Sequence, residues 1–303
     1  MKDLIIGEND AGQRLDKFLT KAFPSLPPGM LYKAVRKKDI KINGKRAFGD
    51  TLLQLHDNIK IYIKDEFLVK KSAVNYRRFD IDIIYEDDNI ILINKPSGLV
   101  VHEDDAGSTD TLIGRLIGFL IKKGEYDPEN EQSFVPALCN RLDRNTSGIV
   151  IAAKTASALR SMNEKIKKRE ISKFYLCVTV GIPPEGEFTA YHIKGDALVK
   201  IFDREVPGSK KIVTRFKVIK TYDTEPKTAL IEAELITGRT HQIRAHLAHL
   251  GFPLLGDGKY GKNSVNKHFH VKTQLLHAYK IIIDDTTYQT EMPWFEDLLT
   301  KVF

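Results

Sequence analysis

Residues 140–155 have the sequence Asn-Arg-Leu-Asp-Arg-Asn-Thr-Ser-Gly-Ile-Val-Ile-Ala-Ala-Lys-Thr, which joins a polar loop to an apolar element. The run Asn-Thr-Ser-Gly predicts a turn, and the apolar residues 149–153 predict a buried strand. Asp143 therefore lies on a loop anchored by the core, between Arg141 and Arg144. Because positive charge favours an ionised carboxylate, Asp143 is either a salt-bridged structural residue or a nucleophile ready to react. Taken alone, the loop favours the structural interpretation, since aspartates in turns usually cap backbone groups or pair with arginine.

The composition of the 303 residues is that of a globular protein, with 42% hydrophobic and 29% charged side chains. This length can bury a large core and accommodate two or three domains. The first residues lack the apolar segment of a signal peptide, and no apolar run approaches the length that spans a bilayer. We therefore expect a cytoplasmic protein that does not act at a membrane. The two cysteines, Cys139 and Cys177, are too few for a disulfide framework and are expected to be reduced and packed.

The net charge of +7 is concentrated near the N-terminus. Residues 1–64 contain 13 Lys and Arg against 7 Asp and Glu, a balance of +6, and residues 65–303 hold the remaining +1. A small basic unit joined to a nearly neutral larger one indicates a binding surface for a polyanion attached to a part with another task. Nucleic acid is the first candidate. An anionic membrane is less favoured, because no basic amphipathic helix with exposed aromatic residues stands out.

Two helices and a small sheet are predicted within this basic unit. Helical spacing of apolar residues predicts a helix over residues 14–23, and Pro27-Pro28 suit the first turn of a second helix. Asn43-Gly44 predicts a hairpin turn, and alternation over residues 58–63 predicts another strand. Basic residues gather at the end of the second helix and on the hairpin: Arg36, Lys37, Lys38, Lys41, Lys45 and Arg46. This group is either a solvated face or a nucleic-acid surface. Residues 12–64 resemble the S4 RNA-binding domain, in which two helices and a small sheet present basic residues to structured RNA.

A second unit begins beyond residue 80. Residues 65–80 have no firm apolar period and are predicted to be a linker between domains at residues 1–64 and 81–303. Helices are predicted at residues 111–120 and 156–168, with a short terminal helix beginning at Pro293-Trp294. Strands are predicted in a hairpin over residues 83–93 and at residues 173–180, 211–219, 228–236 and 275–283. Several long strands with interspersed helices indicate an α+β fold with a mixed, largely antiparallel sheet and flanking helices.

A second polar segment follows the strand at residues 228–236. Residues 237–251, Thr-Gly-Arg-Thr-His-Gln-Ile-Arg-Ala-His-Leu-Ala-His-Leu-Gly, predict a turn, a helix and a glycine stop. The three histidines lack the spacing and the glutamate of zinc-protease helices, so no metal site is expected. The run 256–261, Gly-Asp-Gly-Lys-Tyr-Gly, fits neither a phosphate loop nor a dinucleotide motif, so no nucleotide cofactor is supported. Tyr175, on a predicted strand, is either a core tyrosine or a residue that stacks on a base.

Five motifs occur along the chain in a specific order. They are Asn94-Lys95-Pro96-Ser97-Gly98-Leu99-Val100-Val101-His102, Arg141-Leu142-Asp143-Arg144-Asn145-Thr146-Ser147-Gly148, Lys173-Phe174-Tyr175, Gly238-Arg239-Thr240-His241-Gln242-Ile243-Arg244-Ala245-His246-Leu247 and Gly256-Asp257. In this order they resemble the motifs of the RluA family of pseudouridine synthases, and the S4-like N-terminal unit makes the chain most similar to its RluC/RluD-type members. The likeness spans nearly the whole chain. Asn140 departs from it, because the family usually has histidine before Arg-Leu-Asp; that position is not the catalytic one, so local packing is affected more than activity.

The resemblance implies an isomerase that cuts the N1–C1′ bond of uridine, rotates the uracil and joins C5 to C1′ without a metal or cofactor. It assigns the catalytic carboxylate to Asp143, which acts either by attack at C1′ or by removing a proton from C2′. It implies that Arg244 is the charge partner of Asp143 and that Tyr175 packs on the target base. Substrate contacts are expected from two further groups, which are Arg141 and Leu142 at the centre and Arg36, Lys37, Lys38, Lys45 and Arg46 in the basic unit.

RNA is the expected partner, and the family suggests 23S ribosomal RNA of the large subunit or a ribosome precursor, although some relatives modify transfer RNA. No obligate protein partner is implied, and we expect a monomer. Two other classes compete with the synthase. A protein that only binds RNA on an inactive synthase fold is disfavoured by the intact set Asp143, Tyr175 and Arg244. A hydrolase usually needs a second acid across the bond, and no second carboxylate has a comparable context.

Overall fold

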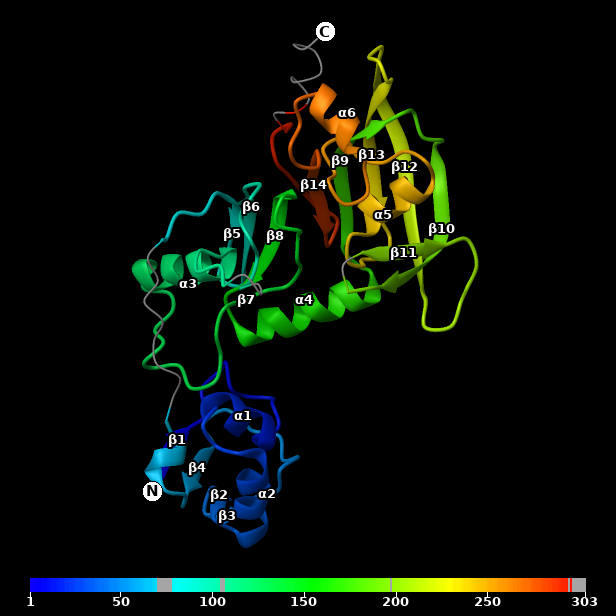
Figure 1. Cartoon of the computed structure of the whole chain (residues 1–303). Coiled ribbons are helices and arrows are strands. Elements are labelled where there is room, and N and C mark those ends of the chain that lie inside the picture. Colours follow the sequence, from blue (N-terminus) through cyan, green and yellow to red (C-terminus); the bar gives the residue numbers. More distant parts are fainter. Residues whose placement is uncertain (70–77, 104–106, 197, 294, 296–303) are drawn as a thin grey trace.

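The computed structural model describes residues 1–69, 78–103, 107–196, 198–293 and 295, which form a smaller and a larger unit (Figure 1). The smaller unit has four strands in the order β1-β4-β2-β3, beside two helices. Its elements are β1 (Lys2–Ile5), α1 (Leu15–Ala22), α2 (Pro28–Lys37), β2 (Ile40–Ile42), β3 (Lys45–Arg46) and β4 (Asn58–Ile61). The helices and one face of the sheet enclose an apolar core around Phe18 and Ile59. Asn43 and Gly44 both have positive φ, as the predicted hairpin turn requires.

The larger unit is organised around an 11-stranded sheet with the order β11-β10-β12-β13-β9-β14-β8-β6-β5, in which β15 also pairs with β14 and β7 with β8. Its strands are β5 (Ile83–Glu86), β6 (Ile90–Lys95), β7 (Ala137–Leu138), β8 (Ser147–Ala153), β9 (Ser172–Val180), β10 (Gly186–Lys194), β11 (Val199–Phe202), β12 (Lys210–Tyr222), β13 (Thr228–Leu235), β14 (Leu276–Ile283) and β15 (Thr286–Gln289). Among these described strands β14 and β8 pair in parallel, and the other pairs are antiparallel. The prediction of an α+β fold with a largely antiparallel sheet is confirmed.

Helices cover both faces of this sheet. They are α3 (Leu112–Lys123), α4 (Ala156–Lys168), α5 (Gln242–His249) and α6 (Asn263–His268). Side chains of α3 and α5, such as Leu116 and Leu247, share one core cluster with Tyr175 of β9. On the opposite face of the sheet, Met162 of α4 packs with Ile151 of β8. The alternation of side chains along β8 and β9 thus separates two apolar layers.

Hydrogen bonds connect the smaller unit to the chain between α3 and β7 and to the start of α4. The side-chain amide of Asn9 donates to Glu131 at 2.7 Å, and its oxygen accepts from the backbone amide of Ala156, the first residue of α4, at 3.0 Å. Gln13 donates to the hydroxyl of Ser133 at 3.0 Å. The smaller unit is therefore attached to the larger one by polar contacts as well as by the chain itself.

Several segments differ from the predicted elements or fall outside them. Leu68 is buried in the core of the smaller unit, so this core continues four residues beyond the predicted boundary at residue 64, and Asp65–Phe67 forms a short 3-10 helix. Residues 70–77 of the predicted linker and most of the predicted terminal helix after Pro293 lie outside the described residues. β10 and β11 were not predicted, because polar residues such as Thr189 and His192 weaken the apolar alternation of β10 and β11 is only four residues long.

Within the described residues, no helix combines the length and the apolar character needed to cross a membrane.

Candidate active site

A buried lysine fixes the loop between β7 and β8. The Nζ of Lys95, at the end of β6, donates to the carbonyl oxygens of Pro96, Leu99 and Arg144 at 2.8, 2.8 and 2.9 Å. Its side chain has no exposed surface, and burial lowers the pKa of Lys95 to about 8 although the charge of Asp143 opposes this shift. The backbone beside Asp143 is thereby tied to the core strand β6.

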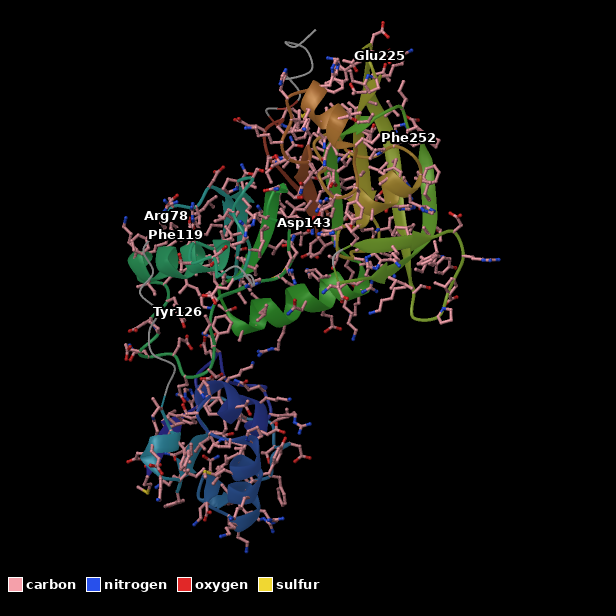
Figure 2. The ribbon with its side chains drawn as sticks, viewed as in Figure 1. Arg78, Phe119, Tyr126, Asp143, Glu225 and Phe252 are labelled. Carbon is pink, nitrogen blue, oxygen red and sulfur yellow. The ribbon has the colours of Figure 1, made fainter. Side chains whose placement is uncertain are left out.

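A glycine lets β8 approach β14 directly after this loop. Gly148 has a φ of +107°, and a Cβ at this position would lie 2.2 Å from the carbonyl oxygen of Ala278. A larger residue would therefore separate the short parallel pair, in which His277 lies opposite Ser147 and Ala278 opposite Gly148. Asp143 lies at this junction, in the middle of the larger unit (Figure 2).

Arg244, on α5, joins two carboxylates. Its Nη1 donates to Oδ2 of Asp143 at 2.7 Å, while its Nε and Nη2 donate to the two oxygens of Asp257 at 2.7 and 2.9 Å. Asp257 is fully buried and also accepts from the backbone amides of Lys259 and Tyr260. Burial lowers the pKa of Arg244, but the hydrogen bonds and charges of Asp257 and Asp143 outweigh it and hold this pKa above its ordinary value. A permanently charged guanidinium is thus oriented by a buried carboxylate toward a partly exposed one.

The second oxygen of Asp143 faces His241. The distance from Oδ1 of Asp143 to Nε2 of His241 is 3.8 Å, which is longer than a hydrogen bond. The Nδ1 of His241 is hydrogen-bonded to the hydroxyl of Tyr260 at 2.9 Å, and the ring of Tyr260 lies 5.4 Å from Cζ of Arg244. Burial lowers the pKa of His241 even though the charge of Asp143 opposes the shift. Arg244, which donates a hydrogen bond to Asp143, is therefore its charged partner.

Tyr175 lies on β9, in the core next to the loop. Its side chain is 7% exposed, and burial raises the pKa of its hydroxyl, with an additional contribution from the charge of Asp143. Only a small part of the ring is available to contact a base. Leu142 is also buried and belongs to the same core cluster. Its side chain is 8% exposed, so only a small part of it is available to a substrate, as for Tyr175, and its contact with substrate stays a prediction.

Asn140, which replaces the usual histidine of the resemblance, connects the loop to β8. Its side-chain oxygen accepts from the backbone amide of Ile151 at 2.8 Å, next to the backbone hydrogen bond from Cys139 to the carbonyl of Ile151. Burial raises the pKa of the Cys139 thiol to about 12, and both cysteines are free, as predicted. The substitution is thus accommodated by a backbone contact away from Asp143.

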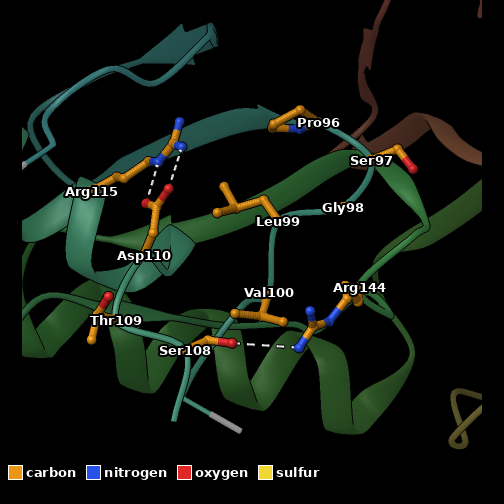
Figure 3. Close-up of a pocket in the computed structure, with 10 residues that line it drawn as sticks. All are labelled: Pro96, Ser97, Gly98, Leu99, Val100, Ser108, Thr109, Asp110, Arg115 and Arg144. Carbon is orange, nitrogen blue, oxygen red and sulfur yellow. Dashed lines mark hydrogen bonds and ion pairs between the residues drawn. The ribbon is translucent and has the colours of Figure 1, made fainter. Parts of the chain in front are cut away.

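The arginines that flank Asp143 in the sequence are exposed. Arg144 borders a cavity of about 430 Å³ and donates to the hydroxyl of Ser108 at 3.4 Å (Figure 3). Arg115, in the wall of the same cavity, is paired with Asp110 at 2.8 Å. Among the contacts of the described residues, Asp143 pairs with Arg244 rather than with either neighbour.

The motif order and this geometry agree with a comparison against known families. A family model described as RNA pseudouridylate synthase matches residues 89–249, which include Asp143, Tyr175 and Arg244. The chain belongs to this family. The family predicted from the five motifs is thereby confirmed, and the protein is an RNA pseudouridine synthase, an isomerase of uridine in RNA.

Relatives of this synthase family cover most of the chain. Ribosomal large subunit pseudouridine synthase C of Buchnera aphidicola subsp. Baizongia pistaciae is 35% identical over 295 residues, covering 92% of this chain and 88% of the relative. The protein with the same description from Haemophilus ducreyi is 32% identical and covers 91% of this chain and 85% of the relative. A solved structure of human RNA pseudouridylate synthase domain containing 4 has a similar fold, with a TM-score of 0.56 and 23% identity, covering 72% of this chain and 90% of that one.

The basic residues predicted to bind RNA outside the centre all lie in the smaller unit of this synthase, away from Asp143 (Figures 1 and 2). All five are exposed, and they are Arg36, Lys37, Lys38, Lys45 and Arg46. They do not share one face. Lys45 pairs with Ile42 and Arg46 pairs with Lys41, so Lys45 and Arg46 project to opposite faces of the small sheet.

Two residues of the synthase centre were not assigned a role from the sequence. Lys95 and Asp257 both lie within the motifs, but each also bonds to a residue of a different motif, Arg144 for Lys95 and Arg244 for Asp257. A lysine that ends an apolar strand and an aspartate between glycines are signals of a buried charge, yet the sequence does not reveal which group neutralises it.

Proposed function

We propose that this synthase converts uridines of large-subunit ribosomal RNA to pseudouridine, with Asp143 as the catalytic carboxylate. The observation that supports this role most is the ion pair between Asp143 and Arg244, whose guanidinium is itself oriented by Asp257. The large-subunit substrate is supported by the descriptions of relatives that cover about nine-tenths of the chain.

In the proposed reaction the ionised carboxylate of Asp143 acts on the ribose, through attack at C1′ or removal of the C2′ proton. The N1–C1′ bond breaks, the freed uracil rotates beside Tyr175, and a C5–C1′ bond forms while C5 loses its proton and N1 gains one. In the first route this step also breaks the bond between C1′ and the Asp143 oxygen, and in the second Asp143 returns the proton to C2′. Arg244 holds Oδ2 of Asp143, and Oδ1 accepts no hydrogen bond from the described residues. One oxygen is thus positioned and the other is available to the ribose.

Binding must offset the cost of extruding the target nucleotide, which is on the order of a few kcal/mol. We assign part of this binding free energy to the exposed Arg141, which is close to Asp143 in the sequence. We assign another part to the smaller unit, which we propose is an S4-type RNA-binding domain. Its exposed basic residues contribute phosphate contacts that depend on salt. We further propose that the protein acts as a monomer in the cytoplasm, which light scattering of the purified chain and cell fractionation would test.

The experiment that tests the proposed function is a pseudouridine map of ribosomal and transfer RNA from cells with and without the gene. Complementation with the wild type should restore specific large-subunit positions, whereas Asp143→Asn should not. An unchanged map on deletion would reject the function, and a loss confined to transfer RNA would reject the substrate. For the chemical route, uridine deuterated at C2′ should slow turnover if Asp143 removes that proton and leave it unchanged if Asp143 attacks C1′.

A further inference from the structure

The small sheet has one face covered by the core and one open face that carries a row of cations. Lys60 of β4 lies opposite Lys41 of β2, and Lys41 lies opposite Arg46 of β3. Side chains that are opposite each other in neighbouring strands project to the same side of a sheet. The alternate residues Ile59 and Ile61 are fully buried, so the three cations lie on the solvent side.

One carboxylate borders these three cations: Asp3 of β1 lies opposite Lys60, at the end of the row, but forms no ion pair with it. Within the part of the chain that the structure describes, neither Lys41, Arg46 nor Lys60 forms an ion pair. Like charges directly opposite each other destabilise a sheet. An arrangement that costs folding stability is expected where a function requires it, and an anion placed along the row would remove the repulsion.

Two exposed aromatic side chains border the row. The Nζ of Lys41 lies 5.6 Å from the ring centroid of Tyr62, and Cζ of Arg46 lies 4.9 Å from that of Phe48. Tyr62 is 46% exposed and Phe48 is 54% exposed. Cations interleaved with exposed aromatic rings are the combination that holds single-stranded nucleic acid, because every base has a face that can stack. A duplex hides those faces within its own base stack, so an unpaired segment fits better.

We propose that this surface, formed by Lys41, Arg46, Phe48, Lys60 and Tyr62 and here named the sheet face, binds a single-stranded segment of the substrate RNA. Phosphates lie along the cation row, and bases stack on Tyr62 and Phe48. The inference rests on the RNA function proposed above and adds a surface separate from the basic end of α2. It divides the predicted RNA-binding residues, since Arg46 belongs to the sheet face and Lys45 does not.

The binding test uses the full-length protein and a fluorescent, unstructured oligouridylate of about 12 nucleotides, long enough to span a site of the size seen for single-stranded binders. The variant Lys41→Gln/Arg46→Gln/Lys60→Gln is compared with a control of equal charge change, Lys262→Gln/Lys267→Gln/Lys272→Gln, whose residues are exposed in the larger unit. Losing three phosphate contacts should lower the slope of log K against log salt by about 2, since each contributes about 0.7 with single strands. The control should keep the wild-type slope.

Stacking is tested separately with Phe48→Leu and Tyr62→Leu, which keep an apolar side chain at each position. Each should weaken oligouridylate binding by about fivefold or more, which corresponds to the lower end of about 1 kcal/mol per stacked base, without changing the salt slope. The proposal would be overturned if the double variant Phe48→Leu/Tyr62→Leu bound oligouridylate with wild-type affinity. It would also be overturned if the two triple variants had equal salt slopes. A triple variant that loses binding to phosphatidylserine vesicles but keeps oligouridylate affinity would overturn it as well.

The same variants separate this proposal from the proposed function. In pseudouridine assays the sheet-face variants should raise KM while kcat at saturating RNA stays within about twofold, because the sheet face is remote from Asp143 and uniform binding changes KM. Asp143→Asn should instead lower kcat and leave KM nearly unchanged. If Asp143→Asn kept activity, the proposed function would fail while the oligouridylate result would still decide the sheet face. Thermal melting of each variant confirms that the small sheet remains folded.

Discussion

The charges of the two units are arranged in opposite ways. Around Asp143 the charged groups are largely buried and have fixed partners, with Arg244 held between two carboxylates and Lys95 bonded to three carbonyl oxygens. On the sheet face the cations lie opposite one another without ion pairs, with Arg46 exposed and Lys41 and Lys60 half-buried. The first arrangement fixes atoms in place and is little screened by salt; the second adapts to a polyanion and is strongly screened. Precise chemistry and adaptable binding are therefore assigned to different units.

Among the changes considered, replacing Arg244 should have the largest effect on stability and activity. Arg244→Met leaves Asp257 buried without a cation, which should lower the free energy of unfolding by about 3–5 kcal/mol. It also frees Asp143, and kcat should fall by a factor of roughly 10²–10³, comparable to the loss of one fixed electrostatic partner in other enzymes. Calorimetry and single-turnover assays at saturating RNA measure the two effects.

A double variant separates those two effects of Arg244. Arg244→Met/Asp257→Leu removes the unpaired charge, so it should regain much of the stability lost by the single variant but none of the activity. Recovery of kcat in the double variant would show that Asp143 does not need a fixed cation. Equal stability of the single variant and the wild type would show that Asp257 is not a buried charge of the kind described.

Lys95 should have the next largest effect. Lys95→Met leaves carbonyl oxygens of the loop without their donor, at a cost of roughly 2–3 kcal/mol in the free energy of unfolding. Because the loop then loses its attachment to β6, kcat should fall more than KM rises. Urea unfolding and steady-state assays test this, with Lys167→Met, an exposed residue of α4, as the matched control. A Lys95→Met protein as stable and active as the control would mean that the loop is positioned by other contacts.

Acid should destabilise the larger unit through two buried histidines. His246 and His277 are hydrogen-bonded to Thr214 and Ser147, and burial lowers the pKa of each to about 4. The unfolded chain, with a His pKa of about 6.5, takes up these protons first on acidification. The stability that the two neutral histidines contribute is complete above pH 6.5 and is lost as pH falls toward 4. At pH 5 the free energy of unfolding should be lower by about 2 kcal/mol per histidine.

The pH dependence is checked by urea unfolding of the wild type and His277→Gln between pH 7.5 and 5. The variant should lose less stability over this interval than the wild type, because it has one histidine fewer to protonate. An identical loss in both proteins would contradict a buried, neutral His277.

Replacing Asn140 should have the smallest effect, because this residue lies at the edge of the group of fixed polar contacts around Asp143. Asn140→His can retain an acceptor for the amide of Ile151, so we expect a change below about 1 kcal/mol and kcat within twofold of the wild type. Asn140→Leu loses the acceptor and should cost about 1 kcal/mol by thermal melting. A large drop in kcat for Asn140→His would connect this residue to the chemistry.

Local patterns predicted the helices and the hairpin of the smaller unit, because apolar spacing and Asn43-Gly44 determine them within a few residues. The pairing of Asp143 with Arg244 came from the resemblance, since no local rule brings together residues 101 apart in the chain. The roles of Lys95 and Asp257 were missed because a buried charge is only recognisable once the groups around it are placed.

The sheet face could not be predicted from the sequence either. The basic residues were visible as a group, but the register that aligns Lys60, Lys41 and Arg46, and sends Lys45 to the other side, depends on which strands pair. A hairpin turn sets the register of β2 and β3, whereas the pairing of β2 with β4 joins segments that no turn connects directly.

The central claim is that Asp143 is the catalytic carboxylate of an RNA pseudouridine synthase. Its most direct test is single-turnover conversion of large-subunit ribosomal RNA by the wild type and Asp143→Asn, with RNA affinity measured on the same preparations. The account predicts no detectable pseudouridine from Asp143→Asn and an affinity within a few-fold of the wild type. Pseudouridine formation by Asp143→Asn at a rate near that of the wild type would contradict it.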